Sequence, residues 1–288
     1  MSTRTVHRAT LADSFRQTVT IALATAKEAI RQPAFFVLAF IAVAWLVCSI
    51  FVSYFTFGED IKMYKDTGLT TISFVGLLLA LLTASSSVAE EIEGKTAITL
   101  LSKPINRRQF IAGKFLGIEL AVLALFLLLG ATFVAGVWYK FGYDQRESAS
   151  VVTDYGKYQE QVIQVLPGLA LGFMEVTLLA AISVAISTRL PILVNLVVCI
   201  AIFFLGHLTP ILVESTAGGQ ANELVQFMAR LFAFALPFLE FFNAGPAIST
   251  GVVIPWLGFV LPAFGYCVLY SGAALMFAFL LFENRDVA

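Results

Sequence analysis

The sequence contains few charged residues: Asp, Glu, Lys and Arg make up only 13% of its 288 positions. A soluble domain typically carries about 25% charged residues. Hydrophobic residues account for 59% of the chain, and the mean hydropathy is +0.88. A single soluble core of this size cannot bury so much apolar surface, and exposed apolar patches aggregate. The composition therefore excludes a soluble globular protein, a disordered chain and a collagen-like fibre, and it predicts that lipid surrounds most of the chain.

An excess of basic residues is also missing. The chain has 18 Lys and Arg against 19 Asp and Glu, for a net charge of −1. Proteins that bind nucleic acid need basic residues to neutralise phosphates, so we expect no nucleic-acid partner. Cysteine is scarce as well, and Cys48, Cys199 and Cys267 all lie within apolar runs. No Cys–His spacing indicates a metal site, so we interpret these cysteines as packing residues and expect no metal.

The chain does contain six long apolar runs. A helix that crosses a membrane needs about 20 mainly apolar residues. The pattern therefore predicts an all-α polytopic membrane protein with six transmembrane helices. The predicted spans are residues 33–57, 67–89, 120–139, 161–188, 190–213 and 257–282.

Residues 224–255 do not form one continuous apolar run long enough to be predicted as a span. Charged residues and prolines interrupt the segment, among them Arg230, Glu240 and Pro246. Broken backbone is tolerated at membrane depth only where protein shields its polar groups. We favour an interfacial or re-entrant hairpin here, and a seventh span stays open as the alternative.

The distribution of basic residues predicts the orientation. With the N-terminus inside, the inner segments hold 12 of the 18 Lys and Arg residues and the outer segments hold 6. Cytoplasmic loops are enriched in Lys and Arg, so we expect a multi-pass protein of the cell membrane with both termini in the cytoplasm. The outer loops are then residues 58–66, 140–164 and 214–255.

Residues 1–32 are predicted to form a cytoplasmic N-terminal segment that precedes the membrane domain, residues 33–288. Apolar side chains recur there at helical spacing, and most of the charged side chains lie off that stripe. The pattern predicts an amphipathic helix that lies on the inner leaflet and anchors the first span. The stripe comprises Leu11, Phe15, Val19, Ala22, Ala26 and Ile30.

The cytoplasmic loop between the second and third spans, residues 89–114, concentrates charge. Residues 90–114 hold eight charged side chains in 25 positions. An acidic part leads into a short apolar stretch, a proline ends any helix, and a basic part follows. A short helix of this kind is suited to docking on a soluble partner, whereas the alternative is a solvated inner loop. The docking candidates are Glu90, Glu91, Glu93, Gly94, Lys95, Thr96, Leu100, Leu101, Lys103, Pro104 and Arg107.

The same loop matches a relaxed nucleotide-binding pattern, because Ala89 is followed at the right spacing by Gly94-Lys95-Thr96. A true P-loop follows a strand and cradles phosphate at a helix N-terminus. Here a membrane helix precedes the motif, and neighbouring glutamates would repel phosphate. We therefore expect that this chain does not bind ATP.

Three polar residues stand out inside the predicted spans, where polar groups are costly and suggest a role. Glu175 lies near the middle of the fourth span and could bind a cation, relay a proton or bond a neighbouring helix. Asn195 could bond across helices, and Glu119 is interpreted as a structural residue near the inner interface. His207, in the fifth span, is interpreted as a packing histidine.

The loop resembles the coupling loop of permease subunits of type-2 ATP-binding-cassette (ABC) transporters. The similar features are Glu90-Glu91, Gly94, Thr96, Leu100-Leu101, Ser102-x-Pro104-x-x-Arg107 and Gly113-Lys114, and the chain ending Leu281–Asp286 is similar to the last turn of that family's final span. Lys95 departs from the family pattern, which often has the Gly and Thr adjacent.

The resemblance implies a type-2 exporter-like permease without catalytic residues or cofactors of its own. Two permease subunits, either a homodimer or a pair with a related chain, would form the pathway in the bilayer. A separate cytosolic ATPase would bind ATP and Mg. It would grip residues 90–103 as a coupling helix and drive movement of an unidentified substrate, with export as the expected direction.

Two other functions remain as alternatives. An ion-coupled secondary transporter could use Glu175, but such proteins usually show two related halves, which this sequence lacks. An intramembrane enzyme would need a nucleophile and base at matching depth. His207 is the only histidine within a span, and no Gly-x-Ser-x-Gly motif is present. Co-purification of a soluble ATPase would separate the first function from these two.

Overall fold

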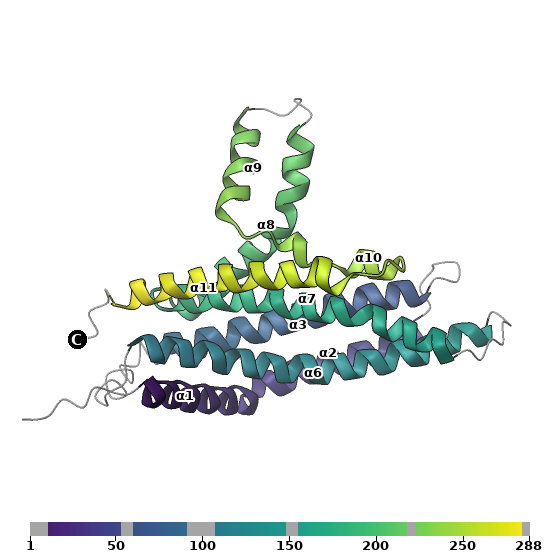
Figure 1. Ribbon diagram of the computed structural model, residues 1–288, viewed down its shortest axis with the longest axis horizontal. Helices are drawn as coiled ribbons and strands as arrows, with labels where there is room; N and C mark the ends of the chain where they lie inside the picture. Colours follow the sequence, from purple (N-terminus) through teal and green to yellow (C-terminus); the bar gives the residue numbers. More distant parts are fainter. Residues whose placement is uncertain (1–10, 53–59, 91–106, 148–154, 218–222, 284–288) are drawn as a thin grey trace, which may run out of the picture.

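The computed structural model describes residues 11–52, 60–90, 107–147, 155–217 and 223–283. Regular structure within these ranges is helical, with no strand among them (Figure 1). In chain order the elements are α1 (Leu11–Arg31), α2 (Pro33–Phe51), α3 (Asp60–Ala84), the π-helix η1 (Ser85–Glu90), α6 (Arg107–Glu147), α7 (Tyr155–Ser187), α8 (Ile192–Ala217), α9 (Glu223–Ala235), the 3-10 helix η2 (Leu239–Phe242), α10 (Gly245–Ser249), the π-helix η3 (Trp256–Val260) and α11 (Leu261–Glu283).

The six-span prediction is confirmed for the described part of the chain. Six helical segments there are long and apolar enough to cross a membrane. They are Pro33–Phe51, Asp60–Ser87, Arg108–Arg146, Tyr155–Ser187, Ile192–Glu214 and Trp256–Phe282. The protein is thus an all-α polytopic membrane protein, as its composition requires.

Several helices extend further than the apolar runs indicate. Residues 60–66, expected in an outer loop, form the first turns of α3, and α6 continues to Glu147. Buried polar contacts explain these extensions. Lys65 donates to the side-chain oxygens of Gln161 and Gln164 on α7. Lys140 of α6 is buried between Asp60, at 3.4 Å, and Asp144, at 3.5 Å.

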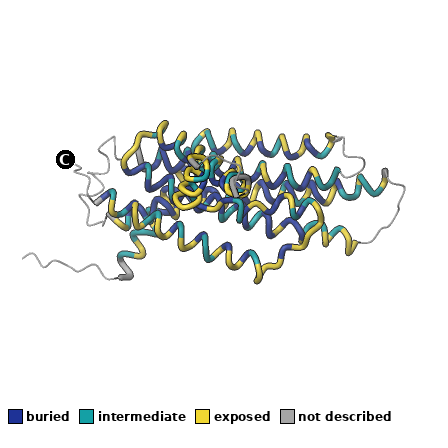
Figure 2. Tube along the Cα trace, turned by 90° about the horizontal axis from the view of Figure 1, so that it is seen from above, coloured by how far each residue is buried: buried dark blue, intermediate teal, exposed yellow. Residues whose placement is uncertain are grey.

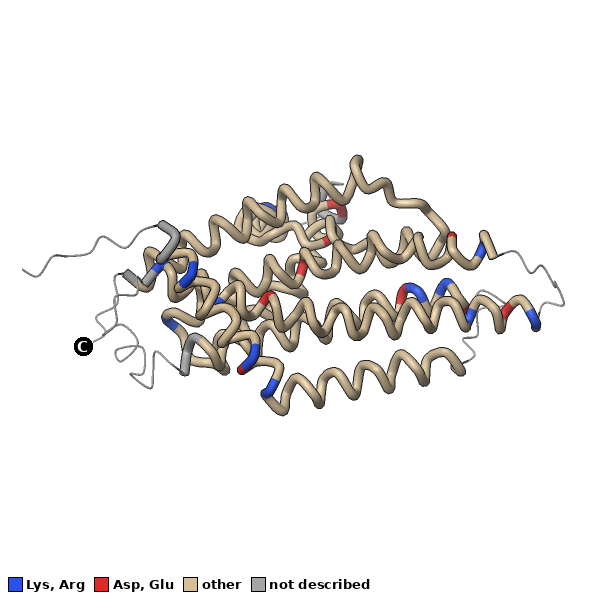
Figure 3. Tube along the Cα trace, turned by 60° about the horizontal axis from the view of Figure 1, so that its bottom comes forward, with Lys and Arg blue, Asp and Glu red and all other residues tan. Residues whose placement is uncertain are grey.

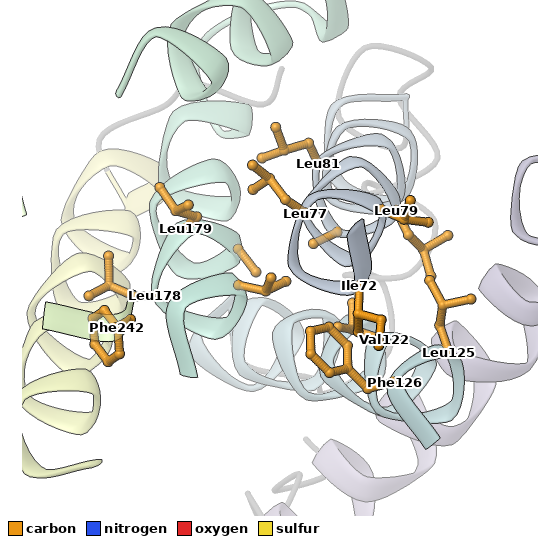
Figure 4. Packing of buried hydrophobic residues seen from close by; sticks show 14 of the residues in the cluster. Ile72, Leu77, Leu79, Leu81, Val122, Leu125, Phe126, Leu178, Leu179 and Phe242 are labelled. Atoms are coloured by element: carbon orange, nitrogen blue, oxygen red, sulfur yellow. The ribbon is translucent and has the colours of Figure 1, made fainter. Parts of the chain in front are cut away.

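The centre of the bundle consists of α3, α6 and α7. Figure 2 shows that buried positions concentrate along the inside of the bundle, with exposed positions on its periphery. Leucines of α3 such as Leu77 and Leu79 lie close to Val122 and Leu125 of α6 and to Leu179 of α7 (Figure 4). Because lipid is as apolar as these side chains, close packing rather than the hydrophobic effect holds such helices together.

Helix α1 lies along the N-terminal part of α6 (Figure 1). Two glycines of α6 permit the approach: a Cβ on Gly117 would lie 2.5 Å from Thr25 Cβ and 2.6 Å from the carbonyl oxygen of Ala22. A Cβ on Gly113 would lie 2.8 Å from Ile21 Cβ. Phe15 of the predicted apolar stripe is instead 73% exposed. Only part of that stripe therefore packs on protein, and placement of α1 on the inner leaflet stays a prediction.

Helices α8 and α9 form a hairpin that projects from the side of the bundle (Figure 1). Apolar side chains on it are strongly exposed, including Leu193 at 76% and Phe234 at 93%. After α9 the chain bends by 56° into the segment Leu239–Ser249. This bent pair could form one further span or a re-entrant segment, so both interpretations of residues 224–255 stay open.

Charged residues gather at the two ends of the bundle and leave its middle nearly uncharged (Figure 3). Arg108 and Arg189 lie at one end, where α6 begins and α7 has just ended. Arg146 and Lys157 lie at the other end, where α6 ends and α7 begins. This separation is typical of a bundle whose middle faces hydrocarbon and whose ends face water.

Replacing Gly117 by Ala should destabilise the protein, because the new methyl group would overlap backbone as well as side chain of α1. We expect the free energy of unfolding to fall by about 1–3 kcal/mol. The matched control is Gly272→Ala in α11, where a Cβ meets nothing within 4 Å. That change should leave stability unchanged or raise it by about 1 kcal/mol. Thermal unfolding of both purified variants measures the difference, and equal melting temperatures would contradict the close α1–α6 packing.

Candidate functional site

Most of the predicted docking loop lies outside the described residues. Glu91, Glu93, Gly94, Lys95, Thr96, Leu100, Leu101, Lys103 and Pro104 belong to the undescribed range 91–106, while the backbone of Glu90 ends η1 and that of Arg107 begins α6. Elements η1 and α6 contact each other. The docking role of the loop stays a prediction.

Asn195 joins the helix that precedes this loop to the rest of the bundle. It is fully buried in the first turn of α8, and its Nδ2 lies 2.7 Å from Ser85 Oγ of η1. The same nitrogen lies 2.8 Å from Ser183 Oγ and 2.8 Å from Ser187 Oγ, both on α7. An amide nitrogen carries two hydrogens, so it donates to two of these three hydroxyls at a time. The predicted bonding of Asn195 across helices is present, and it links η1, α7 and α8.

A second contact ties η1 to the N-terminal helices. Gln32, between α1 and α2, donates from Nε2 to Ser86 Oγ at a distance of 3.4 Å. The serines of this segment were not among the sequence-based candidates for the site. Together with Asn195 they connect the start of the loop to α7, to α8 and to the residue that joins α1 to α2.

Glu119 connects α6 to α7. Its Oε2 accepts a hydrogen bond from Thr177 Oγ1 at 2.8 Å, whereas its buried Oε1 has no hydrogen-bond partner among the described residues. An acceptor and donor matched in this way stabilise contact between two helices in lipid. The geometry supports the structural interpretation of Glu119.

Glu175 is buried on α7, with only 5% of its surface exposed. His207 of α8 approaches it, with Nε2 3.3 Å from Glu175 Oε1. The two groups form an ion pair when His207 is protonated, and this carboxylate oxygen has no hydrogen-bond partner among the described residues. The other ring nitrogen, His207 Nδ1, lies 3.1 Å from the carbonyl oxygen of Phe203.

The carboxylate of Glu175 borders a cavity of about 260 Å³. Four parts of the chain enclose it: α3, α7, α8 and the segment from η2 to α10. Glu175 and His207 share its wall with other polar side chains, namely Thr70, Ser73 and Asn243. Gly172 of α7 also lines it, and a Cβ there would overlap Ser73 Oγ. The glycine thus keeps the serine hydroxyl close to the α7 backbone, one turn from Glu175.

Comparison with known protein families shows to which family this chain belongs. A family model described as "ABC-2 family transporter protein" matches residues 52–287. The chain belongs to this ABC-2 family. The matched range includes η1, the loop and every helix from α3 to α11, and thus both Asn195 and Glu175. A search of curated proteins found no match.

Membership makes this ABC-2 protein a membrane permease component of an ABC transporter. Permeases of this family are generally non-catalytic and work with an ABC ATPase. Among the described residues, no group of three or more His, Cys, Asp or Glu side chains is arranged to hold a metal ion.

The proximity of Glu175 and His207 was missed by the sequence analysis of this ABC-2 protein. The positions of the two residues along α7 and α8 would have predicted their contact. Glu175 lies 12 residues before the end of α7 at Ser187, and His207 lies 15 residues after the start of α8 at Ile192. At 1.5 Å per residue the two depths are about 18 Å and about 22 Å. Matching depths along neighbouring antiparallel spans would have paired them.

Replacing Thr177 by Val should destabilise this ABC-2 protein, because it removes the hydroxyl donor of Glu119 and leaves a buried carboxylate without it. We expect a loss of about 1–3 kcal/mol in the free energy of unfolding. Thr71→Val is the matched control, since the Thr71 hydroxyl bonds only the carbonyl of Thr67 in its own helix. Denaturation of both variants in detergent tests this, and an equal loss at both sites would remove the structural role of Glu119.

Proposed function

We propose that this chain is the permease subunit of an ABC exporter and that a separate cytosolic ATPase drives it. Family membership supports the permease role and the ATPase partner. ATP and Mg would bind to that partner, which would bind residues 90–103 from the cytoplasmic side. The chain itself would supply the membrane pathway and no catalytic group. It would lie in the cell membrane with both termini in the cytoplasm.

The observation that carries this proposal is the hydrogen-bonded contact of Asn195. Residue Ser85 begins η1, which leads directly into the loop, and Asn195 binds it to α7 and α8. These two helices also hold Glu175 and His207 on the wall of the cavity. A shift of the loop on the ATPase would therefore reach the cavity through one buried side chain rather than through flexible backbone.

The ATPase transmits work only if it contacts the permease differently in its two nucleotide states. The π-helical geometry of η1 is suited to such a change, because π-helical turns are rare and often mark functional sites. Its backbone hydrogen bonds can rearrange toward α-helical ones as the loop moves. The serine hydroxyls of η1 would then alter their bonds to Asn195 and Gln32.

A second copy of the permease is part of the proposal. The projecting hairpin of α8 and α9 supports it, because apolar side chains cover several sides of that hairpin. Phe227 is 62% exposed and Phe234 is 93% exposed. Packing against a homologous bundle would cover this surface and would place two sets of α7 and α8 around one pathway.

Reversing three loop charges, with Glu90, Glu91 and Glu93 each changed to Lys, should abolish stimulation of the ATPase without unfolding the permease. The sequence predicts that these side chains face the cytoplasm, so we expect the melting temperature to stay close to that of the wild type. The measurement is ATPase activity of the complex in proteoliposomes with and without the variant. Unchanged stimulation by the triple variant would remove the docking assignment.

Changing Asn195 to Ala should distinguish binding of the ATPase from stimulation of its activity. The ATPase should still co-purify, whereas its stimulation by the permease should fall severalfold, because η1 loses its bond to α7 and α8. Cys199→Ala is the matched control, because Cys199 lies on the same helix and donates to Asn195 Oδ1 at 3.3 Å, so its loss leaves the three bonds of Asn195 Nδ2 in place. Both assays are made well below the melting temperature of each variant. Equal stimulation by the two variants would contradict the transmission role of Asn195.

The ion-coupled alternative makes a different prediction from the ABC proposal. A secondary transporter would move substrate in vesicles that hold this chain alone, under an ion gradient and without nucleotide. The ABC permease should show no uphill transport under these conditions and should gain it with the ATPase and ATP. Uphill transport by the lone chain would favour the alternative.

A further inference from the structure

The cavity beside Glu175 has the chemistry of a specific binding site. We infer that it binds an organic ammonium ion of small size, whose N–H groups donate to Glu175 Oε1 and His207 Nε2 while its apolar part contacts Phe203, Phe204 and Phe242. This inference deepens the proposed function, since it names the class of substrate, and it rests on that function only for the role of the ligand as cargo.

The first argument concerns the two atoms that face each other in the cavity wall. A carbonyl oxygen only accepts hydrogen bonds, so the contact with Phe203 places the hydrogen of neutral His207 on Nδ1. His207 Nε2 then presents a lone pair toward Glu175 Oε1, 3.3 Å away. One proton on either group would pair the two atoms with each other, and in its absence the N–H of a bound cation can donate to both. An ammonium group offers several N–H donors and a positive charge to the carboxylate.

The second argument concerns charge. None of the described residues that line the cavity is Lys or Arg. Two further carboxylates lie near it: Glu240 accepts a hydrogen bond from Asn243, and a Cβ on Gly245 would lie 2.6 Å from Asp66 Oδ1. In the low dielectric of the bilayer, this set of carboxylates strongly favours a cation over an anion.

The third argument concerns the remaining wall. Three phenylalanines line the cavity, and aromatic faces attract organic cations. A bare metal ion fits this wall poorly, because alkaline-earth and transition metals need several oxygen, nitrogen or sulfur ligands. Glu175 and His207 are the only described Asp, Glu, His or Cys side chains that border the cavity. A volume of about 260 Å³ accommodates an amine with an apolar group of modest size.

The test measures binding of benzylammonium to the full-length chain in lipid nanodiscs, by titration calorimetry against empty nanodiscs. Benzyl alcohol removes the charge, and benzyltrimethylammonium keeps the charge but removes the N–H donors. We expect benzylammonium to bind about tenfold more tightly than either compound, as the loss of a charged hydrogen bond predicts. Equal affinity of benzyl alcohol would overturn the inference, and equal affinity of benzyltrimethylammonium would overturn the role of the N–H donors.

The matched variants are Glu175→Gln and Glu119→Gln, which each neutralise one buried carboxyl group. Glu175→Gln should weaken benzylammonium binding by about tenfold or more, whereas Glu119→Gln, whose side chain bonds Thr177 instead, should leave the affinity unchanged. An unchanged affinity in Glu175→Gln, or equal losses in both variants, would refute the assignment.

A measurement on the wild type keeps the inference testable if Glu175→Gln does not fold. Dicyclohexylcarbodiimide modifies buried carboxyl groups, and mass analysis of peptides locates the adduct. Benzylammonium should slow the modification of Glu175, and benzyl alcohol should not. An unchanged rate of modification with benzylammonium would refute the site.

The binding assay needs no ATPase, so the two proposals fail separately. Absent benzylammonium binding would remove the ligand class and leave ATPase coupling intact. Absent ATPase stimulation would remove the proposed function and leave ammonium binding as a property of the cavity.

Discussion

Hydrocarbon offers no hydrogen bonds, so every polar group inside this bundle must find its partner within the protein. This constraint accounts for the pairing of Glu119 with Thr177, of Lys65 with two glutamines, and of Asn195 with three serines. Each of these contacts joins different helices, and together they fix which spans are neighbours. Several buried side-chain oxygens, among them Glu119 Oε1 and Glu175 Oε1, have no hydrogen-bond partner among the described residues. That of Glu175 differs in bordering a cavity that His207 also lines, which is why we propose the ligand site there.

The same constraint connects the two ends of the proposed mechanism. Asn195 holds η1 against α7 and α8 at the end of the bundle where the charged loop begins. About 12–18 Å along the same two helices, by the rise of an α-helix, Glu175 and His207 face the cavity. Two long helices thus carry both the contact beside the proposed docking loop and the residues that border the cavity. Movement at one end can change the geometry at the other without an intervening flexible segment, which is what an ATP-driven permease requires.

The sequence predicts the large features of this protein well, because they follow from composition and run length. Six long apolar runs produce six candidate spans, and Pro33 begins α2 where the first run begins. The sequence does not predict where polar residues extend a helix, since the burial of Lys65 depends on glutamines almost 100 positions later. It also indicates that Asn195 bonds across helices without naming Ser85, Ser183 and Ser187 as its partners. The interpretation of His207 as a packing residue did not include its contact with Glu175. That contact is predicted only when the depths of the two residues in adjacent spans are compared.

The central claim is that Asn195 transmits movement of the proposed ATPase-docking loop to the cavity. The most direct measurement is the rate at which dicyclohexylcarbodiimide modifies Glu175 in the permease–ATPase complex, compared without nucleotide and after trapping with Mg-ATP and vanadate. The account predicts that trapping changes this rate in the wild type and that Asn195→Ala removes the change while the ATPase stays bound. The same rate in both states of the wild-type complex would contradict the account.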